Sequence, residues 1–437
     1  MKKNLKSLVR SIEPELRNYR RDFHTYAEPG WGEYRTASII AQRLEELGYR
    51  IRIGREVIDE AARMGLPSET VMAQQFERAK SEGAIEEYAD QMRGGFTGVV
   101  GELTNGDGPV LGFRFDIDAV EMEEKEQDGH LPFREGFASI HPEAMHSCGH
   151  DGHAAIGLGL AEVISRMKDE LRGTVRLIFQ PAEEGVRGAK AMVEAGVVDG
   201  LDYLLGMHIG AKAKKTGEFF CGTCGFLATS KFDAFFHGFS THAGFDPQDG
   251  RNALLAAATA VLNLHAISRH GDGSTRINVG KMSAGSGRNV IPAEAHLVLE
   301  TRGEDSKLNG YMKEYAERII RHAAEMHGVE YSIVQMGEAA SADSDAELMK
   351  RIHRTAEKKA LFPALQDRKA TLGGSEDFTH MMKRVSEGGG KATYCMLGSN
   401  LAGNHHTGRF DFDESILVKG VHFLFLVVLD ILGKGAK

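Results

Sequence analysis

Hydrophobic and polar residues alternate along the chain in two patterns that together predict an α/β fold. Short apolar runs, typical of buried strands, are separated by longer segments whose apolar residues recur with a helical period. Strands that alternate with helices favour a sheet with helices on its faces. Outside the middle of the chain, the predicted strands are Pro109–Phe115, Thr174–Phe179, Tyr203–Met207 and Ala392–Leu397, and the predicted helices are Glu33–Leu47 and His153–Met167.

The middle of the chain predicts a second, smaller unit. Strand-like and helical segments follow one another in the order β-α-β-β-α-β over ~110 residues, which is a compact arrangement of its own. We therefore expect an α+β, ferredoxin-like domain at residues 225–336, inserted into a larger domain made of residues 1–224 and 337–437. Its segments are Phe226–His237, Asn252–Ala266, Thr275–Met282, Ala295–Thr301, Lys307–His327 and Glu330–Met336.

Residues 55–93 differ from the segments on either side of them. They are polar, rich in Glu, Arg and Gln, and helical in propensity, although strand-like segments flank them. We predict that they form an insertion on the surface of the larger domain, and the sequence assigns it no role.

Composition and charge narrow the class of protein. The 437 residues are 42% hydrophobic and 26% charged, which supports a sizeable core and excludes a disordered chain. The net charge of -9, without any Lys/Arg-rich run, argues against a nucleic-acid or anionic-membrane partner. Four cysteines are too few for a disulfide framework and fit a reducing compartment.

One stretch, Ile416 to Leu432, is apolar enough to be compared with a membrane span. It is short and is interrupted by Lys419, His422 and Asp430, so we predict a buried helix. The N-terminal segment has basic residues but no apolar run of signal-peptide length. We therefore expect a soluble, cytoplasmic protein with no membrane partner.

Polar clusters follow the predicted strands at the points where the strands end. In an open α/β sheet, ligands bind beyond the carboxyl ends of the strands, so we expect these separate segments to deliver donors to one edge. The clusters are Asp116 and Asp118, Glu183 and Glu184, His208, and His405 and His406.

The densest cluster is the segment Met145–His153. In an extended loop, residues two apart point the same way, so Cys148 and His150 could bind one metal ion. Thiolate and imidazole suit Zn²⁺ or a neighbouring first-row metal, and carboxylates widen the choice to Mn²⁺. The alternative is a loop whose histidines cap a helix and whose cysteine is merely buried.

The two acidic pairs have separate interpretations. Either of Asp116 and Asp118 could bind metal or orient a histidine ligand, and the alternative is a turn cap. Glu183 and Glu184 are adjacent, so one can face a metal while the other faces the water that a two-metal hydrolase activates. The alternative for this pair is a solvated acidic turn.

Two features belong to the predicted smaller domain. His242 lies among small residues in Ser240–Gly244, where a substrate could approach closely, although a loop histidine often has no special role. The turn Gly285–Asn289 is Gly-rich, but no nucleotide-binding context surrounds it.

Five ordered motifs, spread over most of the chain, resemble the M20 metallopeptidase family and most of all its amidohydrolase branch. The resemblance implies a di-metal catalytic domain with a smaller dimerisation or lid domain. The motifs are Arg114–Ala119, Met145–His153, Gln180–Gly185, Gly373–Phe378 and His406–Glu414.

The resemblance also implies roles for single residues. Glu183 would be the general base, and Asp118 would stand behind a ligand and orient it. Asp116 stands where other branches place a metal-binding histidine, which leaves its role open. The spacing to Phe410 favours His406 over His405 as the last ligand. The implied metal ligands are Cys148, His150, Glu184, His208 and His406.

In the smaller domain, His242 matches a lid histidine that, in dimers of the family, enters the opposite active site and polarises the scissile carbonyl. Asn289 matches a lid motif of the family. Arg288 and Arg302 are our own candidates for binding a substrate carboxylate, because a guanidinium group can hold both carboxylate oxygens.

The expected activity is metal-assisted hydrolysis of the amide bond of an N-acyl amino acid, with p-aminobenzoyl-glutamate as the first choice. The expected cofactors are two divalent metal ions, Mn²⁺ or Zn²⁺. The partner would be a second copy of the chain or a paralogous subunit. Two alternatives stay open: a related specificity for N-acyl or N-acetyl amino acids or dipeptides, and a non-catalytic subunit of a hetero-oligomer.

Overall fold

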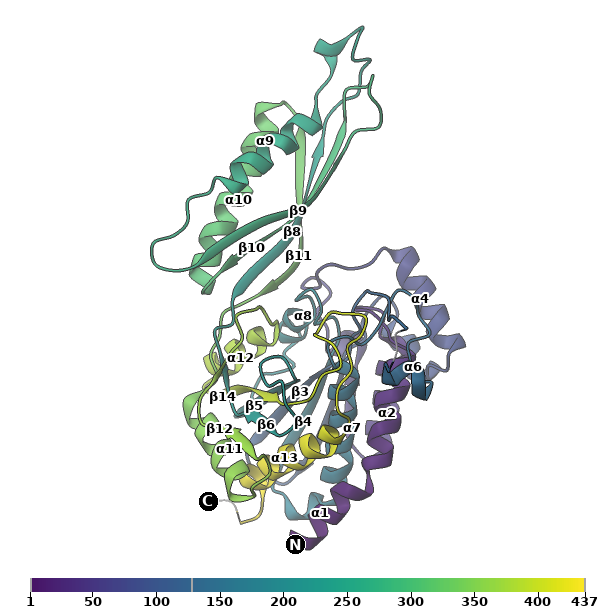
Figure 1. The fold of residues 1–437 in the computed structure, drawn as a ribbon, viewed down its shortest axis with the longest axis vertical. Helices are drawn as coiled ribbons and strands as arrows, with labels where there is room; N and C mark the ends of the chain where they lie inside the picture. The colour runs from purple at the N-terminus through teal and green to yellow at the C-terminus, as the bar shows by residue number, and fades with distance from the viewer. Residues whose placement is uncertain (1, 127–128, 436–437) are drawn as a thin grey trace. The chain divides into compact units, whose positions relative to one another are not determined.

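The structure is a computed structural model that describes residues 2–126 and 129–435, and the chain divides into two compact units (Figure 1). The first unit contains Met1–Cys224, Ala342–Leu372 and Asp377–Lys437. The second contains Gly225–Ser341 and the short segment Gly373–Glu376. The second unit therefore continues five residues beyond the expected end at 336 and takes in a later piece of chain.

The first unit is built on a mixed sheet of eight strands. Its centre is parallel, because β4, β3, β5 and β14 all run in the same direction, and antiparallel or short strands flank this centre. A pair of two-residue strands, β7 (Thr223–Cys224) and β13 (Ala370–Thr371), lies outside it. Across the sheet the order is β1 (Arg50–Ile53), β2 (Val99–Asn105), β4 (Gly173–Gln180), β3 (Val110–Asp116), β5 (Tyr203–Ile209), β14 (Lys391–Leu397), β6 (Glu218–Phe220) and β12 (Ala364–Gln366).

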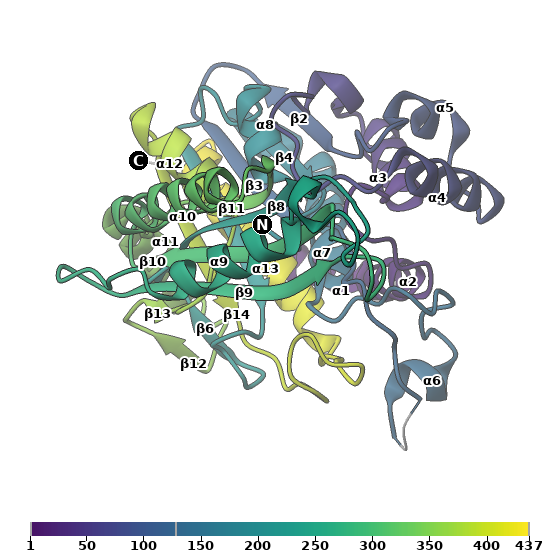
Figure 2. The same ribbon diagram turned by 90° about the horizontal axis from the view of Figure 1, so that it is seen from above.

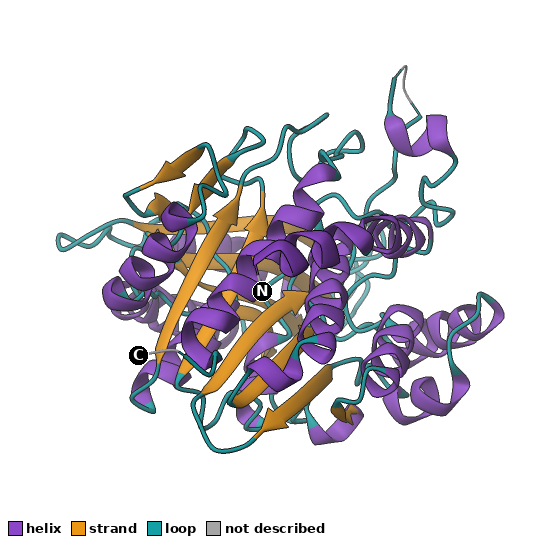
Figure 3. Ribbon diagram, turned by 90° about the horizontal axis from the view of Figure 1, so that it is seen from below, coloured by secondary structure: helices purple, strands orange, loops and turns teal. Residues whose placement is uncertain are grey.

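Helices cover both faces of this sheet, as the alternating pattern predicted (Figure 3). The α-helices of the first unit are α1 (Lys2–Ser11), α2 (Glu13–Thr25), α3 (Tyr34–Glu46), α4 (Glu69–Ser81), α5 (Glu86–Ala89), α6 (Leu131–Glu135), α7 (His150–Arg166), α8 (Ala189–Glu194), α11 (Ala346–Lys358), α12 (Phe378–Glu387) and α13 (Ser415–Leu432). Three short 3-10 helices accompany them, η1 (Gly54–Glu56), η2 (Asp90–Met92) and η3 (Lys168–Glu170).

The central helix α7 packs directly on the parallel strands. Its glycines allow this close approach, since a Cβ atom at Gly157 would lie 2.6 Å from the ring of Phe179. The helix is buried over most of its length between the sheet and helices α2 and α13. It is therefore a rigid element whose first turn can hold side chains in fixed positions.

The apolar stretch Ile416 to Leu432 lies in helix α13. By length and composition this helix could cross a bilayer, yet it packs against α7, α1, α2 and α11. Most of its side chains are buried within the first unit, as the sequence predicted for a core helix.

The insertion at residues 55–93 forms η1, α4, α5 and η2. Figure 2 shows α4 and α5 grouped with α3 at one side of the first unit. Phe76, Tyr88 and Met92 of the insertion are buried in the hydrophobic core of the first unit, so the insertion packs as part of that unit.

The second unit has the predicted element order. Its strands are β8 (Ala228–His237), β9 (Thr275–Ala284), β10 (Glu294–Gly303) and β11 (Glu330–Ala339), and its helices are α9 (Ala253–His265), α10 (Ser306–Met326) and the 3-10 helix η4 (Pro247–Asp249). All strand pairs are antiparallel, in the order β11-β8-β10-β9. Helices α9 and α10 lie side by side on one face of this sheet (Figure 1).

Candidate metal centre

The carboxyl ends of the four parallel strands meet at one edge of the first unit, and the polar clusters lie there. Asp116 ends β3, His208 is near the end of β5, and the other clusters are in the loops that follow β4 and β14. Within each of several groups of these side chains, the ligand atoms all lie within 4.8 Å of one another. The structure thus brings together segments that are far apart in the sequence.

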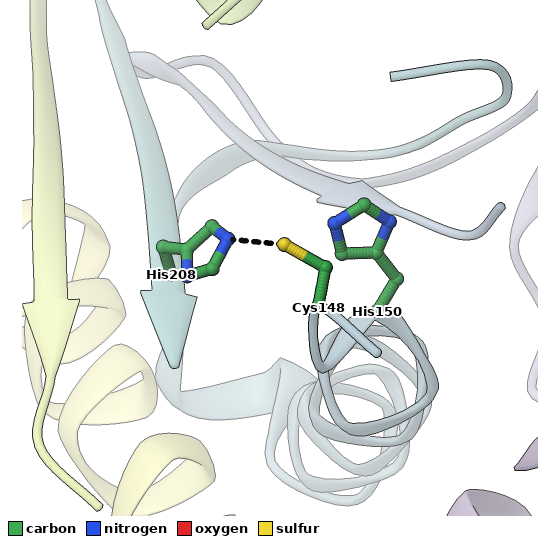
Figure 4. A group of neighbouring side chains, drawn as sticks. All are labelled: Cys148, His150 and His208. Atoms are coloured by element: carbon green, nitrogen blue, oxygen red, sulfur yellow. Dashed lines mark hydrogen bonds between the residues drawn. The ribbon is translucent and has the colours of Figure 1, made fainter. Parts of the chain in front are cut away.

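The first group consists of Cys148, His150 and His208. Figure 4 shows Cys148 between the two imidazole rings, with His208 on a strand and His150 at the start of a helix. The Cys148 Sγ atom lies 3.4 Å from His208 Nε2. All three side chains are buried.

The local conformation of this segment differs from the sequence prediction. An extended loop was expected to carry Cys148 and His150, with the helix beginning at His153, but α7 begins at His150. Gly149 adopts a left-handed conformation with φ of 89°, which turns the chain sharply between the two side chains. The side chains of Cys148 and His150 still point toward the same site. The turn at Gly149 brings them together, as an extended chain was expected to do.

Each imidazole of this group is oriented by its other nitrogen. His150 Nδ1 lies 2.9 Å from the Asp118 carbonyl oxygen and 3.2 Å from its carboxylate, while His208 Nδ1 lies 2.8 Å from the carbonyl oxygen of Ile209. When Nδ1 donates to these oxygens, Nε2 presents a lone pair to the group. His150 Nε2 is buried and has no hydrogen-bond partner among the described residues, as suits an open metal-ligand position.

The second group consists of Cys148, Glu184 and His406. His406 Nε2 lies 3.2 Å from Glu184 Oε1. His406 has a left-handed backbone with φ of 58°, and its amide donates to the Ser147 carbonyl oxygen at 3.0 Å. This bond ties the loop after β14 to the segment that carries Cys148, so the thiol belongs to both groups.

The electrostatics of the two groups favour a cation. Contacts with Cys148 and Glu184 raise the pKa of His406 to about 10. Burial lowers the pKa of His150, but the carboxylates of Asp116 and Asp118 outweigh it and hold this pKa well above its usual range. Burial and Glu184 raise the pKa of the Cys148 thiol. His150, His406 and Cys148 therefore retain protons when no other cation is present, while burial and the nearby His153 lower the pKa of His208, and His406 and His150 lower that of Glu184. A divalent metal ion is the kind of charge that replaces the retained protons.

Glu183 lies beside the two groups. Its Oε2 atom is 3.9 Å from His150 Nε2, and its ligand atom clusters with those of His150 and Glu184. The side chain is largely buried. A carboxylate in this position can accept a proton from a water molecule held among the ligand atoms.

The two aspartates of the first motif have different environments. Asp118 binds His150 through Oδ1 and accepts the amide of Glu184 through Oδ2 at 2.8 Å, so it links two candidate ligands. Asp116 instead contacts Arg114 and His153 Nδ1, and its oxygen is 3.8 Å from His150 Nε2.

The neighbouring His153 uses both ring nitrogens within the protein. Nδ1 contacts Asp116, and Nε2 accepts the amide of Ile209 at 2.9 Å, directly after His208. His153 therefore fixes the end of β5, and Asp116 fixes His153.

Comparison with known proteins agrees with this geometry. The sequence profile of peptidase family M20/M25/M40 matches residues 112–430, which is more than half of the chain. The chain belongs to this family. It is 47% identical over 428 residues to one of the subunits of p-aminobenzoyl-glutamate hydrolase of Escherichia coli (strain K12), with 98% of each chain covered.

Two further relatives are equally informative. The chain is 48% identical over 430 residues to indole-3-acetyl-aspartic acid hydrolase of Enterobacter agglomerans, again with 98% of each chain covered. Its fold matches the crystal structure of an aminobenzoyl-glutamate utilization protein from Klebsiella pneumoniae with a TM-score of 0.85 and 41% identity, covering 99% of this chain and 100% of the other. The chain is therefore an M20 hydrolase with a mixed α/β fold.

Some residues that shape this M20 centre were not predicted from the sequence. Glu33 is buried and accepts the amide of Ala182 at 2.8 Å, just before the acidic pair. Asp377 accepts the amides of Gly188 and Ala189 at 3.1 and 2.9 Å, just after it. Asp377 lies in one of the five M20 motifs, but Glu33 has no local signal, since a single Glu near a helix start is common.

The remaining predicted residues lie in the second unit. His242 is exposed, stacks on Phe245 and pairs through its backbone with Val290, which brings it next to Arg288 and Asn289. Arg302 is separate from them. It lies on β10 about eight residues from the end nearest His242, or about 27 Å along the strand. Its guanidinium group is held by both oxygens of Glu300.

Proposed function

We propose that the protein is a metal-dependent amidohydrolase that cleaves the amide bond of an N-acyl amino acid, with p-aminobenzoyl-glutamate as the first-choice substrate. One observation supports it above the others: two groups of metal-ligand side chains share Cys148, and the carboxylate of Glu183 lies beside them. The relatives named for aminobenzoyl-glutamate support the choice of substrate.

The donor set fits two divalent ions, Mn²⁺ or Zn²⁺. Cys148, His150 and His208 would hold one, and Cys148, Glu184 and His406 would hold the other. When bound, the two ions acidify a water molecule and polarise the amide carbonyl. Thiolate and imidazole ligands favour Zn²⁺, while the carboxylates suit Mn²⁺.

The side chains of the chain perform the remaining steps. Glu183 takes the proton of the attacking water and returns it to the leaving amine, which needs a carboxylate within reach of both. Asp118 keeps His150 in the orientation that points Nε2 at the site, and it holds the amide of Glu184 at the same time. His242 of one chain would donate a hydrogen bond to the carbonyl oxygen in the active site of the other chain of a dimer, as negative charge develops on that oxygen. Asn289 and Arg288 bind the substrate from the same turn, and Arg302 is a separate candidate for a carboxylate.

We assign the second unit the role of lid and dimerisation domain. Its strand β9 is an open edge of the sheet, and the neighbouring helix α9 exposes Leu255 and Leu262, whose side chains a partner would cover. The partner is a second copy of the chain or a paralogous subunit. The second choice is supported by the Escherichia coli relative, whose name makes it one subunit of a hydrolase.

The compartment proposed for the protein is the cytoplasm. All four cysteines are free in the structure, and Cys148 must stay reduced to act as a ligand.

A second candidate is the hydrolysis of a different N-acyl acidic amino acid. The chain is about equally identical to a relative named for indole-3-acetyl-aspartic acid, which joins an aromatic acyl group to an acidic amino acid as well. A non-catalytic role in a hetero-oligomer is the third candidate, which the complete set of donors disfavours.

A substrate panel tests these candidates. The purified chain, stripped of metal by a chelator and reloaded with Mn²⁺ or Zn²⁺, is expected to release amine from p-aminobenzoyl-glutamate faster than from indole-3-acetyl-aspartate, N-acetyl amino acids or dipeptides. The chelated protein should be inactive, because the donors alone cannot acidify water. Hydrolysis that survives chelation would contradict the proposal, and activity only in the presence of a paralogous subunit would favour the third candidate.

His242 supplies a separate prediction. We expect His242→Ala to lower kcat by about 10²–10³-fold, the usual cost of losing one donor to the developing oxyanion. Phe245→Ala is the matched control, since it removes the ring that stacks on His242 but no hydrogen-bond donor. If His242→Ala changes KM and leaves kcat intact, the residue binds substrate and does not stabilise the transition state.

A further inference from the structure

The turn that carries Glu183 and Glu184 is strained. Ala182 and Val186 have left-handed backbones with φ of 51° and 62°, and Gly185 has φ of 86°. A left-handed conformation is costly for a residue with a Cβ atom and most costly for a β-branched one such as Val186. Strain of this kind persists only where surrounding contacts hold the backbone in place.

Buried carboxylates hold the amide groups of this turn. Glu33 accepts the amide of Ala182, Asp118 accepts that of Glu184, and Asp377 accepts those of the two residues that follow Arg187. These contacts restrain the N–H groups of the turn.

Arg187 holds a carbonyl group of the same turn. Its Nε atom donates to the carbonyl oxygen of Glu184 at 2.8 Å, and its Nη1 atom donates to the carbonyl oxygen of Gly65 at 2.9 Å. The guanidinium group fills a narrow slot, because a Cβ atom at Gly30 would lie 2.5 Å from Nη2. Arg187 is therefore a rigid bridge between the acidic turn and residue 65.

Gly65 belongs to the insertion at residues 55–93, and contacts with residues outside the insertion fix its position. The indole Nε1 of the fully buried Trp31 donates to the carbonyl oxygen of Met64 at 2.8 Å. Next to it, Arg63 stacks over the ring of Phe96 at 3.8 Å and donates to the carbonyl oxygen of Gly94. The carbonyl of Gly65 is thus presented to Arg187 by a segment that is itself held on two sides.

We propose that Arg187 is a positioning residue for the Glu183–Glu184 turn and that the insertion at 55–93 is the support against which it acts. This inference rests on the proposed metal site, since it assigns Glu184 the role of a ligand. The insertion would then support the active site. Its backbone carbonyl at residue 65 holds Arg187, and Arg187 keeps the strained turn in the conformation that directs Glu184 toward Cys148 and His406.

The test measures metal affinity directly. Arg187→Ala is expected to weaken Mn²⁺ binding by about 10-fold or more in competition with a chelating dye, as loss of a group that supports a ligand typically does. kcat should fall with it at limiting Mn²⁺, while KM should change little because Arg187 supports the turn and not the substrate. Arg187→Lys should recover little, since an ammonium group cannot bridge the two carbonyls in the same geometry.

Arg176→Ala is the matched control. Arg176 lies in the preceding strand, and its guanidinium group also donates to backbone carbonyls, those of Val197 and Asp199. This variant should lose stability like Arg187→Ala but bind Mn²⁺ like the unaltered chain. Equal Mn²⁺ affinity in both variants would overturn the inference.

A double-mutant cycle tests the part played by the insertion. Trp31→Phe removes the hydrogen bond to Met64 and should weaken Mn²⁺ binding less than Arg187→Ala does. Because both residues act through the same backbone segment, the double variant should lose less affinity than the two single variants combined. Additive losses would mean that Arg187 acts without the insertion. If the unaltered chain binds two Mn²⁺ ions yet hydrolyses no amide, the proposed function fails while this inference stands.

Discussion

Glu183→Gln is expected to lower kcat by about 10²–10⁴-fold while both metal ions remain bound. Glutamine keeps the shape of the side chain but cannot accept a proton, so the variant loses the general base and little else. Glu183 is near His150 Nε2 but belongs to neither of the two ligand groups that share Cys148, which is why the metal content should not change. Steady-state kinetics together with elemental analysis of the dialysed protein measure both quantities.

The adjacent residue is the matched control for this result. Glu184→Gln should lose metal as well as activity, because Glu184 lies in the second ligand group. Excess Mn²⁺ should restore part of the activity of Glu184→Gln and none of that of Glu183→Gln. Substantial turnover by Glu183→Gln, or metal loss in that variant, would reverse the roles given to the two carboxylates.

Arg20→Met is expected to lower the free energy of unfolding by about 3–5 kcal/mol, the usual cost of removing one partner from a buried ionic group. The guanidinium group of Arg20 is fully buried and lies 3.0 Å from Asp151, 2.6 Å from Asp411 and 3.4 Å from Glu414. Methionine fills much of the volume but removes the guanidinium group that three buried carboxylates share, of which Glu414 keeps Arg21 and Asp151 keeps His24. Urea denaturation followed by circular dichroism measures the change.

Arg17→Met on the same helix α2 serves as the comparison. Arg17 pairs with Glu13 at 3.0 Å, but both side chains are substantially exposed, so its loss should cost less than about 0.5 kcal/mol. If Arg20→Met is no more destabilised than Arg17→Met, the buried group does not stabilise the fold. Asp151 directly follows His150 in the first turn of α7, so this group also secures the helix that carries a candidate ligand.

The position of the candidate site at one edge of the sheet was predictable, because polar residues suited to binding metal follow directly after the apolar runs that form the strands. Each apolar run ends in a polar cluster, and parallel strands bring their carboxyl ends together whatever the details of the connections. The element order of the second unit was predictable for a similar reason, since its strands and helices alternate in long, regular segments.

Other elements of the fold were not predicted, because their hydrophobic residues form too weak a pattern in the sequence. Helices α1 and α2 are rich in Lys, Arg and Glu, and their buried positions, such as Leu16 and Phe23, are too few to stand out. Strand β2 enters the sheet antiparallel between β1 and β4, a pairing that depends on the whole sheet and not on its own residues.

The roles of some single residues were predictable from the sequence, and those of others were not. Asp118 was expected to orient a histidine, and its contact with His150 has that geometry. The partnership of Asp116 with Arg114 and His153 was left open, because it depends on how α7 lies across β3. Arg187 could not be found at all from the sequence, since its partner is a backbone carbonyl more than a hundred residues away.

The sharing of Cys148 between two ligand groups has a consequence for biosynthesis. His406 follows Cys148 by more than 250 residues, so a growing chain exposes the thiol long before the second group can form. During that interval the sulfur lacks its partners from the second group and is more open to oxidation than in the folded chain. The order of translation therefore sets a period of vulnerability that ends only when the last strand and its loop close over the cysteine.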